Sequence, residues 1–252
     1  MSQIITIANQ KGGVSKTTTT HAMAAGLDQR GYKVLALDMD PQGNLSDNAG
    51  ADNYSRPTMY ELLKKEATLE ETIQHLSFDI IPSNILLASM EQELNKTGKE
   101  YTLRECIETV LDSYDFIIID TPPSLGILTI NAFTAANEII IPTTAGIFAV
   151  KGIVQLNDTI NTVRKYCNKT LQIAGILLTR FNPRANINKD IKALTAQLSK
   201  QIDAKLYNTY IRSSVVVEEA QAVKKDIFSY AADSTVANDY RLFIDEYLGG
   251  HK

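Results

Sequence analysis

Short runs of apolar residues, each bounded by turn-forming residues, recur along most of the chain. Several of these runs are continuous Ile, Val and Leu, which is typical of parallel strands that are covered on both faces. The pattern predicts strands over residues 4–8, 34–37, 79–81, 116–119, 138–141 and 173–178.

Longer segments with helix-like patterns lie between these runs. They predict helices over residues 16–30, 84–95, 103–111, 125–136, 150–166 and 190–201. The alternation predicts an α/β fold with a doubly wound, mostly parallel sheet, which helices flank and right-handed crossovers connect.

Two further segments stand outside this alternation. Residues 43–57 are polar and rich in turn formers, so we expect a long, mobile loop there. Residues 236–248 place Tyr240, Phe243 and Tyr247 on one stripe of a helix. A stripe of this kind favours packing against the core.

The composition is that of a globular protein, with 44% apolar and 21% charged residues among 252. With no repeat and no Pro/Gly-rich linker, we expect a single domain over residues 1–252. Because no secretory signal or spanning segment is visible, we expect a cytoplasmic protein. Cys106 and Cys167 lack the spacing of metal ligands and are interpreted as ordinary thiols.

The net charge of −4 is unevenly placed. Residues 151–230 carry thirteen Lys and Arg against six Asp and Glu, a local charge of +7 that leaves −11 for the rest. Such a split is typical of one face that meets a polyanion. Solvated helix faces that happen to be basic would give the same count.

The stretch ANQKGGVSKTTTT, residues 8–20, follows the first predicted strand and opens the first predicted helix. Amides at a helix N-terminus hold an anion, and Gly12 and Gly13 let the backbone approach a phosphate. Lys16 is expected to reach the β- and γ-phosphates, and the Thr17 hydroxyl to bind Mg²⁺. The stretch therefore predicts a phosphate-binding loop.

Ser15 departs from the usual loop pattern, which has Gly immediately before the lysine. If the backbone there needs a positive φ, serine costs about 1–2 kcal/mol relative to glycine. Its hydroxyl could instead help to bind phosphate. An additional lysine, Lys11, precedes the glycine pair.

Two acidic motifs end predicted strands. VLALDMDPQGN contains Asp38 and Asp40, and FIIIDTPPSLG contains Asp120. The carboxyl ends of parallel strands meet at one edge of an open sheet, which is where such sheets bind ligands. Nucleotide hydrolysis requires a placed metal ion and an oriented water, and carboxylates at this edge suit both tasks.

The segments KGGVSKTT, DMDPQGN and IIIDTPPSLG resemble, in order and spacing, the deviant Walker A, switch I and Walker B segments of ParA-type (Soj-like) partition ATPases. This deviant Walker A group of P-loop NTPases also includes MinD, the nitrogenase iron protein and ArsA-like ATPases. The match covers residues 3 to about 180 and is weaker beyond. Lys11 resembles the signature lysine of the group.

The resemblance implies an ATP- and Mg²⁺-dependent homodimer in which Lys11 reaches the partner's ATP, Lys16 grips the phosphates and Asp40 orients the attacking water. The implied nucleotide contacts are Lys11, Gly12, Gly13, Val14, Ser15, Lys16, Thr17 and Thr18, with Asp38 behind them. The implied metal contacts are Thr17, Asp40 and Asp120, and the implied adenine contacts are Arg180, Phe181, Asn182 and Pro183.

The ParA-type members of this group segregate DNA. The resemblance implies a nucleoid-associated dimer that binds DNA without sequence preference and is released when a ParB-like partner stimulates slow ATP hydrolysis. The basic second half fits a footprint of phosphate contacts. The candidate DNA contacts are Arg164, Lys165, Lys189, Lys192, Arg212, Lys224 and Lys225.

Two alternatives keep the same nucleotide chemistry. A MinD-like positioning ATPase would dock its C-terminal helix on anionic lipid. Residues 236–248 carry more acidic than basic residues, so we expect no stable membrane association. A regulator that binds nucleotide without hydrolysing it, because of Ser15, is the other alternative.

Overall fold

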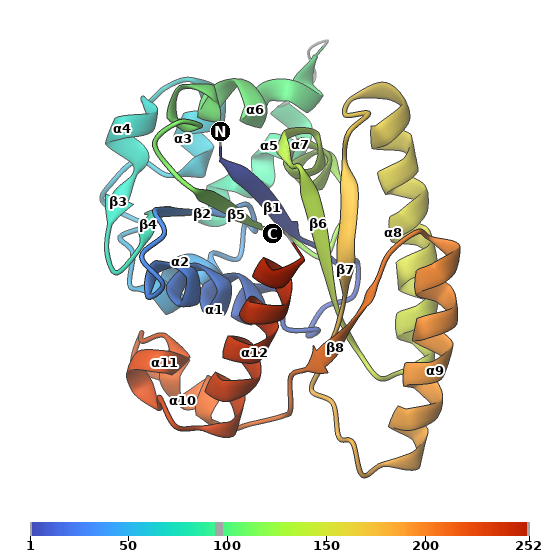
Figure 1. The fold of residues 1–252 in the computed structure, drawn as a ribbon. Coiled ribbons are helices and arrows are strands. Elements are labelled where there is room, and N and C mark those ends of the chain that lie inside the picture. The colour runs from blue at the N-terminus through green and yellow to red at the C-terminus, as the bar shows by residue number, and fades with distance from the viewer. Residues whose placement is uncertain (1, 94–97, 251–252) are drawn as a thin grey trace.

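The computed structural model describes residues 2–93 and 98–250, and Figure 1 shows helices packed around a central sheet. Within the described residues the sheet has eight strands in the order β3-β4-β2-β5-β1-β6-β7-β8. Only the β3–β4 pair is antiparallel. The strands are β1 (Gln3–Ile7), β2 (Val34–Asp38), β3 (Gln74–His75), β4 (Asp79–Ile81), β5 (Phe116–Asp120), β6 (Glu138–Thr144), β7 (Gln172–Thr179) and β8 (Leu206–Tyr210).

Helices cover both faces of the sheet and bury two apolar clusters. One face packs against α3 (Met59–Lys64), α5 (Met90–Glu93), α6 (Thr102–Ile107), α7 (Ile127–Ala135), α8 (Ile147–Tyr166) and α9 (Asn186–Gln201). The other packs against α1 (Lys16–Asp28), α2 (Asn44–Ala49), α10 (Val216–Ala222), α11 (Ile227–Tyr230) and α12 (Thr235–Gly249). The short α4 (Leu69–Thr72) precedes β3.

The central strand β5 explains why the apolar runs are continuous. Ile117 and Ile119 point into one cluster, whereas Ile118 points into the other, and all three are fully buried. Alternate residues of a strand face opposite sides of the sheet, so a strand covered on both faces needs apolar residues throughout. The predicted doubly wound, mostly parallel sheet is thus confirmed.

The helix over residues 236–248 is confirmed as part of the core. Tyr240, Phe243 and Tyr247 are fully buried, and Phe243 packs edge-on against Tyr207 with ring centroids 4.9 Å apart. Within the described residues, no helix is long and apolar enough to cross a bilayer.

The helix predicted over residues 84–95 is wrong. Residues 85–89 form a 3₁₀ helix, Ile85–Ser89, and only Met90–Glu93 is α-helical, while residues 94 and 95 lie outside the described chain. Ile85 and Leu86 are exposed by 65% and 51%, and among the described residues of the segment only Leu87 and Met90 are buried, which is little apolar contact to hold a long helix against the core.

Several helix ends and short elements also differ from prediction. The helix expected over residues 103–111 is α-helical only to Ile107 and continues as a 3₁₀ turn, Glu108–Val110. Helices α8 and α9 begin earlier than predicted. The edge strand β8 was missed because only Tyr207 of its five residues is buried.

The loop predicted over residues 43–57 is also wrong in its first half, which forms α2. Leu45 and Ser46 are fully buried, and the Ser46 hydroxyl donates to Asp38 at 2.6 Å. That hydroxyl also accepts a hydrogen bond from the backbone N–H of Ser83 at 2.8 Å. The polar residues that suggested a loop therefore fasten α2 to the ends of β2 and β4.

We predict that Ser46→Ala lowers the free energy of unfolding by about 2 kcal/mol, because it removes one of the hydrogen bonds to the buried Asp38 carboxylate and leaves the buried Ser83 N–H without a partner. Urea unfolding measures this difference. Ser77→Ala, at an exposed position, is the matched control and should leave stability within about 0.5 kcal/mol of wild type. Equal stability of the two variants would contradict the anchoring role of Ser46.

Candidate functional site

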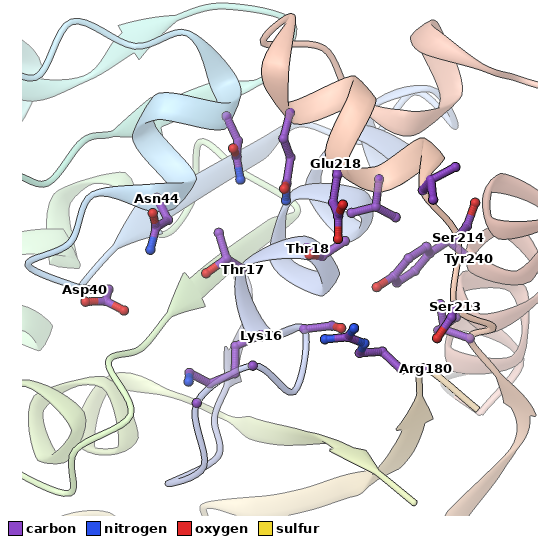
Figure 2. Close-up of a pocket in the computed structure, with 18 of the residues that line it drawn as sticks. Lys16, Thr17, Thr18, Asp40, Asn44, Arg180, Ser213, Ser214, Glu218 and Tyr240 are labelled. Carbon is purple, nitrogen blue, oxygen red and sulfur yellow. The ribbon is translucent and has the colours of Figure 1, made fainter. Parts of the chain in front are cut away.

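The carboxyl ends of β1, β2 and β5 meet at one edge of the sheet. Asp120 is paired in register with Ile7 on one side and with Asp38 on the other, so the predicted loop and both acidic motifs converge there. A cavity of about 650 Å³ opens at this edge. Figure 2 shows Asp40 at one end and Tyr240 at the other, with Lys16 and Thr17 between them.

The phosphate-binding loop has two residues with left-handed backbone. Gly13 has φ 72° and Ser15 has φ 66°, and helix α1 begins immediately afterwards at Lys16. Val14 between them is buried, and its carbonyl accepts a hydrogen bond from the Thr179 hydroxyl at 3.0 Å. The positive φ at Ser15 is held by the anchored residues around it, at a cost of about 1–2 kcal/mol.

Lys16 is buried at the start of α1 and lines the cavity. Burial lowers the pKa of its ammonium, and the charges of Asp120 and Asp40 oppose that shift. A buried cation that two carboxylates only partly compensate is suited to gripping a phosphate. Thr18, two residues further into α1, lines the same cavity.

Asp120 lies behind the loop and is fully buried. The Thr17 hydroxyl donates to its Oδ2 at 2.6 Å, and the Thr20 hydroxyl donates to its Oδ1 at 3.3 Å. Burial and the neighbouring charge of Asp38 raise the pKa of Asp120 to about 8. A divalent cation beside Thr17 would favour the ionised form of this carboxyl.

The arrangement fits Mg²⁺. Among the described residues, no group of three or more His, Cys, Asp or Glu could hold a metal ion by itself. Mg²⁺ does not need such a cage, because it binds through one or two carboxylates, water and the phosphates of its substrate. Thr17, Asp40 and Asp120 bring together one hydroxyl and two carboxyl groups that would hold such an ion.

Asp40 and Asp38 have different surroundings. Asp40 lines the cavity, and its Oδ1 accepts a hydrogen bond from the Gln42 N–H at 3.0 Å. Asp38 does not line the cavity; its carboxylate accepts from Ser46 and from the backbone N–H of Asp40 at 3.1 Å. Burial raises the pKa of Asp38 to about 6. Asp38 therefore positions Asp40 and α2.

Lys11 is exposed at the start of the loop. Its backbone N–H donates to the Asn9 side chain at 2.9 Å, and the Asn9 amide donates to the Pro142 carbonyl at 2.8 Å. The Lys11 side chain is not part of the cavity lining, unlike the neighbouring Gly12 and Gly13.

The far end of the cavity differs from the predicted adenine contacts. Of the four residues 180–183, only Arg180 lines the cavity. Phe181 is buried against Tyr210, with ring centroids 4.8 Å apart, and Asn182 and Pro183 are exposed outside the cavity.

Sequence reasoning missed most of this end. Figure 2 shows Ser213, Ser214, Glu218 and Tyr240 gathered there around Arg180. The other lining residues that were not predicted are Gln42, Asn44, Asn48, Pro123, Ile211, Val215, Val217 and Gln221. Gln42, Asn44 and Pro123 lie within the two acidic motifs, although no site role was predicted for them, and no motif marks the rest. Only the apolar stripe of α12 pointed to Tyr240, and it indicated core packing.

The predicted DNA contacts fall into four places. Arg164 and Lys165 are at the end of α8, where Arg164 donates to the Leu171 carbonyl just before β7. They therefore lie at the amino edge of the sheet, opposite the cavity.

Lys189 and Lys192 are in the first half of α9, which follows the carboxyl end of β7, and Lys224 and Lys225 follow α10. Figure 1 shows α9 and α10 on either side of β8. Arg212 instead lines the cavity and pairs with Asp239 at 2.5 Å.

Comparisons with known proteins show the family to which the chain is similar. Residues 2–173 match the family model described as AAA domain. The chain is 38% identical over 245 residues to the sporulation initiation inhibitor protein Soj of Bacillus subtilis, covering 95% of this chain and 96% of Soj. It is 36% identical over 245 residues to the chromosome partitioning protein ParA of Myxococcus xanthus, covering 94% and 85%.

Two solved structures contain a nucleotide analogue. A putative plasmid partition protein from Borrelia burgdorferi bound to AMPPNP superposes with a TM-score of 0.85 and 26% identity, covering 99% of this chain and all of that one. Cobyrinic acid a,c-diamide synthase from Mycobacterium smegmatis, with an ATP analogue and magnesium, gives 0.80 and 30% identity, covering 97% and 93%.

We predict that Ser15→Gly raises the free energy of unfolding by about 1 kcal/mol, because glycine adopts a positive φ without the Cβ clash. Ser15→Val should lower it, since a β-branched residue fits this backbone worst. Thermal unfolding of the two variants and of the wild type measures their order of stability. A glycine variant less stable than wild type would show that the Ser15 side chain stabilises the loop.

Proposed function

The chain belongs to the ParA- and Soj-type partition ATPases, and from that premise we propose that it hydrolyses ATP slowly, dimerises with ATP and binds DNA without sequence preference. A ParB-like partner would stimulate hydrolysis and so release the DNA. The observation that carries the proposal is the cluster of Lys16, Thr17, Asp40 and Asp120 at one end of a nucleotide-sized cavity.

Hydrolysis requires groups for the transferred phosphoryl and for the attacking water. We assign phosphate binding to Lys16 and the loop amides, and Mg²⁺ binding to Thr17 with Asp40 and Asp120 nearby. Asp40 orients the water, which its position on the cavity lining supports. The Gly43 N–H donates a hydrogen bond to the backbone carbonyl of Asp40 at 2.9 Å. This bond fixes the backbone from which the Asp40 carboxylate extends.

Dimerisation is assigned to Lys11. This lysine is exposed and lies outside its own chain's cavity lining, although the two residues after it line that cavity. An ammonium at the mouth of one site can reach a phosphate in a facing copy. The proposed dimer is thus joined through the nucleotides, which makes its formation depend on ATP.

We place the proposed DNA surface at the carboxyl edge of the sheet, which holds only some of the contacts predicted from sequence. Lys189 and Lys192 on α9 and Lys224 and Lys225 after α10 share that edge with the nucleotide cavity, so a dimer closed on ATP can present them together. Two further observations remove three residues from the predicted DNA contacts. Arg164 and Lys165 lie at the opposite edge, and the charge of Arg212 is balanced by Asp239.

A membrane-docking role has less support. It requires the apolar stripe of α12 to face lipid, and Tyr240, Phe243 and Tyr247 are instead fully buried in the core.

We predict that Asp40→Ala accumulates as a dimer with ATP, because it binds nucleotide but hydrolyses it poorly. Adding Lys11→Ala to that variant should return it to monomer while ATP still binds. Sedimentation velocity measures the two states, and Lys33→Ala, at an exposed position before β2, is the matched control for loss of a lysine. A monomeric Asp40→Ala protein saturated with ATP would refute the dimer.

We predict that DNA binding requires ATP and is not supported by ADP. Charge reversal at Lys224 and Lys225 should weaken it and flatten the slope of log K against log salt by about 4, because the dimer loses two phosphate contacts on each protomer. A filter-binding titration at several salt concentrations measures the slope. Lys33→Glu with Arg104→Glu makes the same charge change at exposed positions elsewhere and should leave the slope unchanged. An unaltered slope in the Lys224/Lys225 variant would remove both residues from the proposed DNA surface.

A further inference from the structure

The segment between β8 and α10 forms most of the wall at the far end of the nucleotide cavity. Ile211, Arg212, Ser213, Ser214 and Val215 all line it in succession. Ser213 and Ser214 make no backbone-to-backbone hydrogen bond with any residue that the structure describes. The wall is held at Ile211 and Arg212, next to β8, and at its other end next to α10, where the Val216 N–H donates to the Ser214 hydroxyl at 3.3 Å and the Glu219 N–H donates to the Val215 carbonyl at 3.0 Å.

Ile211 fixes the first end to the sheet. Its N–H donates to the Leu178 carbonyl at 2.8 Å, and its carbonyl accepts from the Phe181 N–H at 2.9 Å. The next residue, Arg212, leaves the sheet and binds a different element. Its backbone N–H, Nε and Nη2 all donate to the carboxylate of Asp239, at 3.0, 2.9 and 2.5 Å.

Asp239 belongs to α12, and its side chain is only 6% exposed, whereas that of Arg212 is 44% exposed. The next residue, Tyr240, lines the cavity itself, and its hydroxyl lies 3.2 Å from that of Thr19 on α1. Helix α1 is the helix that the phosphate-binding loop opens. Two successive residues of α12 therefore connect the far wall with the helix behind the phosphates.

We propose that Arg212 and Asp239 are positioning residues that hold the far wall at the correct distance from the phosphate-binding loop, so that base and ribose are bound together with the phosphates. A bidentate guanidinium–carboxylate pair with an added backbone N–H fixes both distance and orientation. Without it, the wall must be ordered by the nucleotide at a cost in affinity.

The two ends of the nucleotide can be tested separately. ADP uses both ends of the cavity, whereas pyrophosphate uses only the loop. Isothermal titration calorimetry with Mg²⁺ and each ligand should show that Arg212→Ala weakens ADP binding about tenfold and pyrophosphate binding less than about twofold. Equal weakening of both ligands, or of neither, would overturn the proposal.

Three further variants separate positioning from general destabilisation. The double variant Arg212→Ala with Asp239→Ala leaves neither charge unpaired and should lose no more ADP affinity than either single variant, since the pair acts as a unit. Additive losses would contradict this. Arg212→Lys keeps the charge without the bidentate geometry and should lose most of the ADP affinity that Arg212→Ala loses. Arg241→Ala removes an arginine of α12 that bonds to Ala232 and Asn238 outside the cavity and should bind both ligands as wild type does.

A DNA role for Arg212 predicts a different pattern. At saturating ATP, Arg212→Ala should keep the wild-type salt dependence of DNA binding, because its charge is already paired. A flattened slope with unchanged ADP binding would assign Arg212 to DNA and overturn the positioning role. The inference rests on the nucleotide site of the proposed function alone, so its failure with ADP would leave DNA partition standing.

Discussion

One buried ammonium and three buried carboxyl groups meet at a single edge of the sheet, and the rest of the site depends on them. Removing these groups from water is costly, and the shifts show it: burial lowers the pKa of Lys16 and raises those of Asp38 and Asp120. In the proposed function, a triphosphate would supply the negative partner for Lys16, and Mg²⁺ would supply the positive partner for the carboxylates. The site is therefore complementary to a nucleotide and its metal ion as a pair.

The fold meets this cost with separate supports at the two ends of the cavity. At the end of the cavity near Lys16, Asp38 receives hydrogen bonds from Ser46 and from the backbone of Asp40, which fixes α2 and Asp40 together. At the far end, Arg212 and Asp239 join the wall to α12. Helix α1 lies between the two supports and carries the phosphate-binding lysine.

The phosphate end could be predicted from sequence because its groups belong to short contiguous motifs that follow strands. A parallel sheet brings such strand ends together whatever the details of packing. The far end could not be predicted, because Ser213, Glu218 and Tyr240 belong to no motif and meet only in the folded chain. The same limit applies to α2, where the contact of Ser46 with Asp38 outweighs a loop-like composition.

The most direct test of this account is the affinity of the protein for ADP with Mg²⁺ when the buried ammonium is removed. Calorimetry should show that Lys16→Ala binds at least about a hundredfold more weakly than wild type, as expected when one partner of a buried charged contact is lost. Lys33→Ala should bind as wild type does. Unchanged binding by a folded Lys16→Ala protein would contradict the assignment of the cavity to a nucleotide.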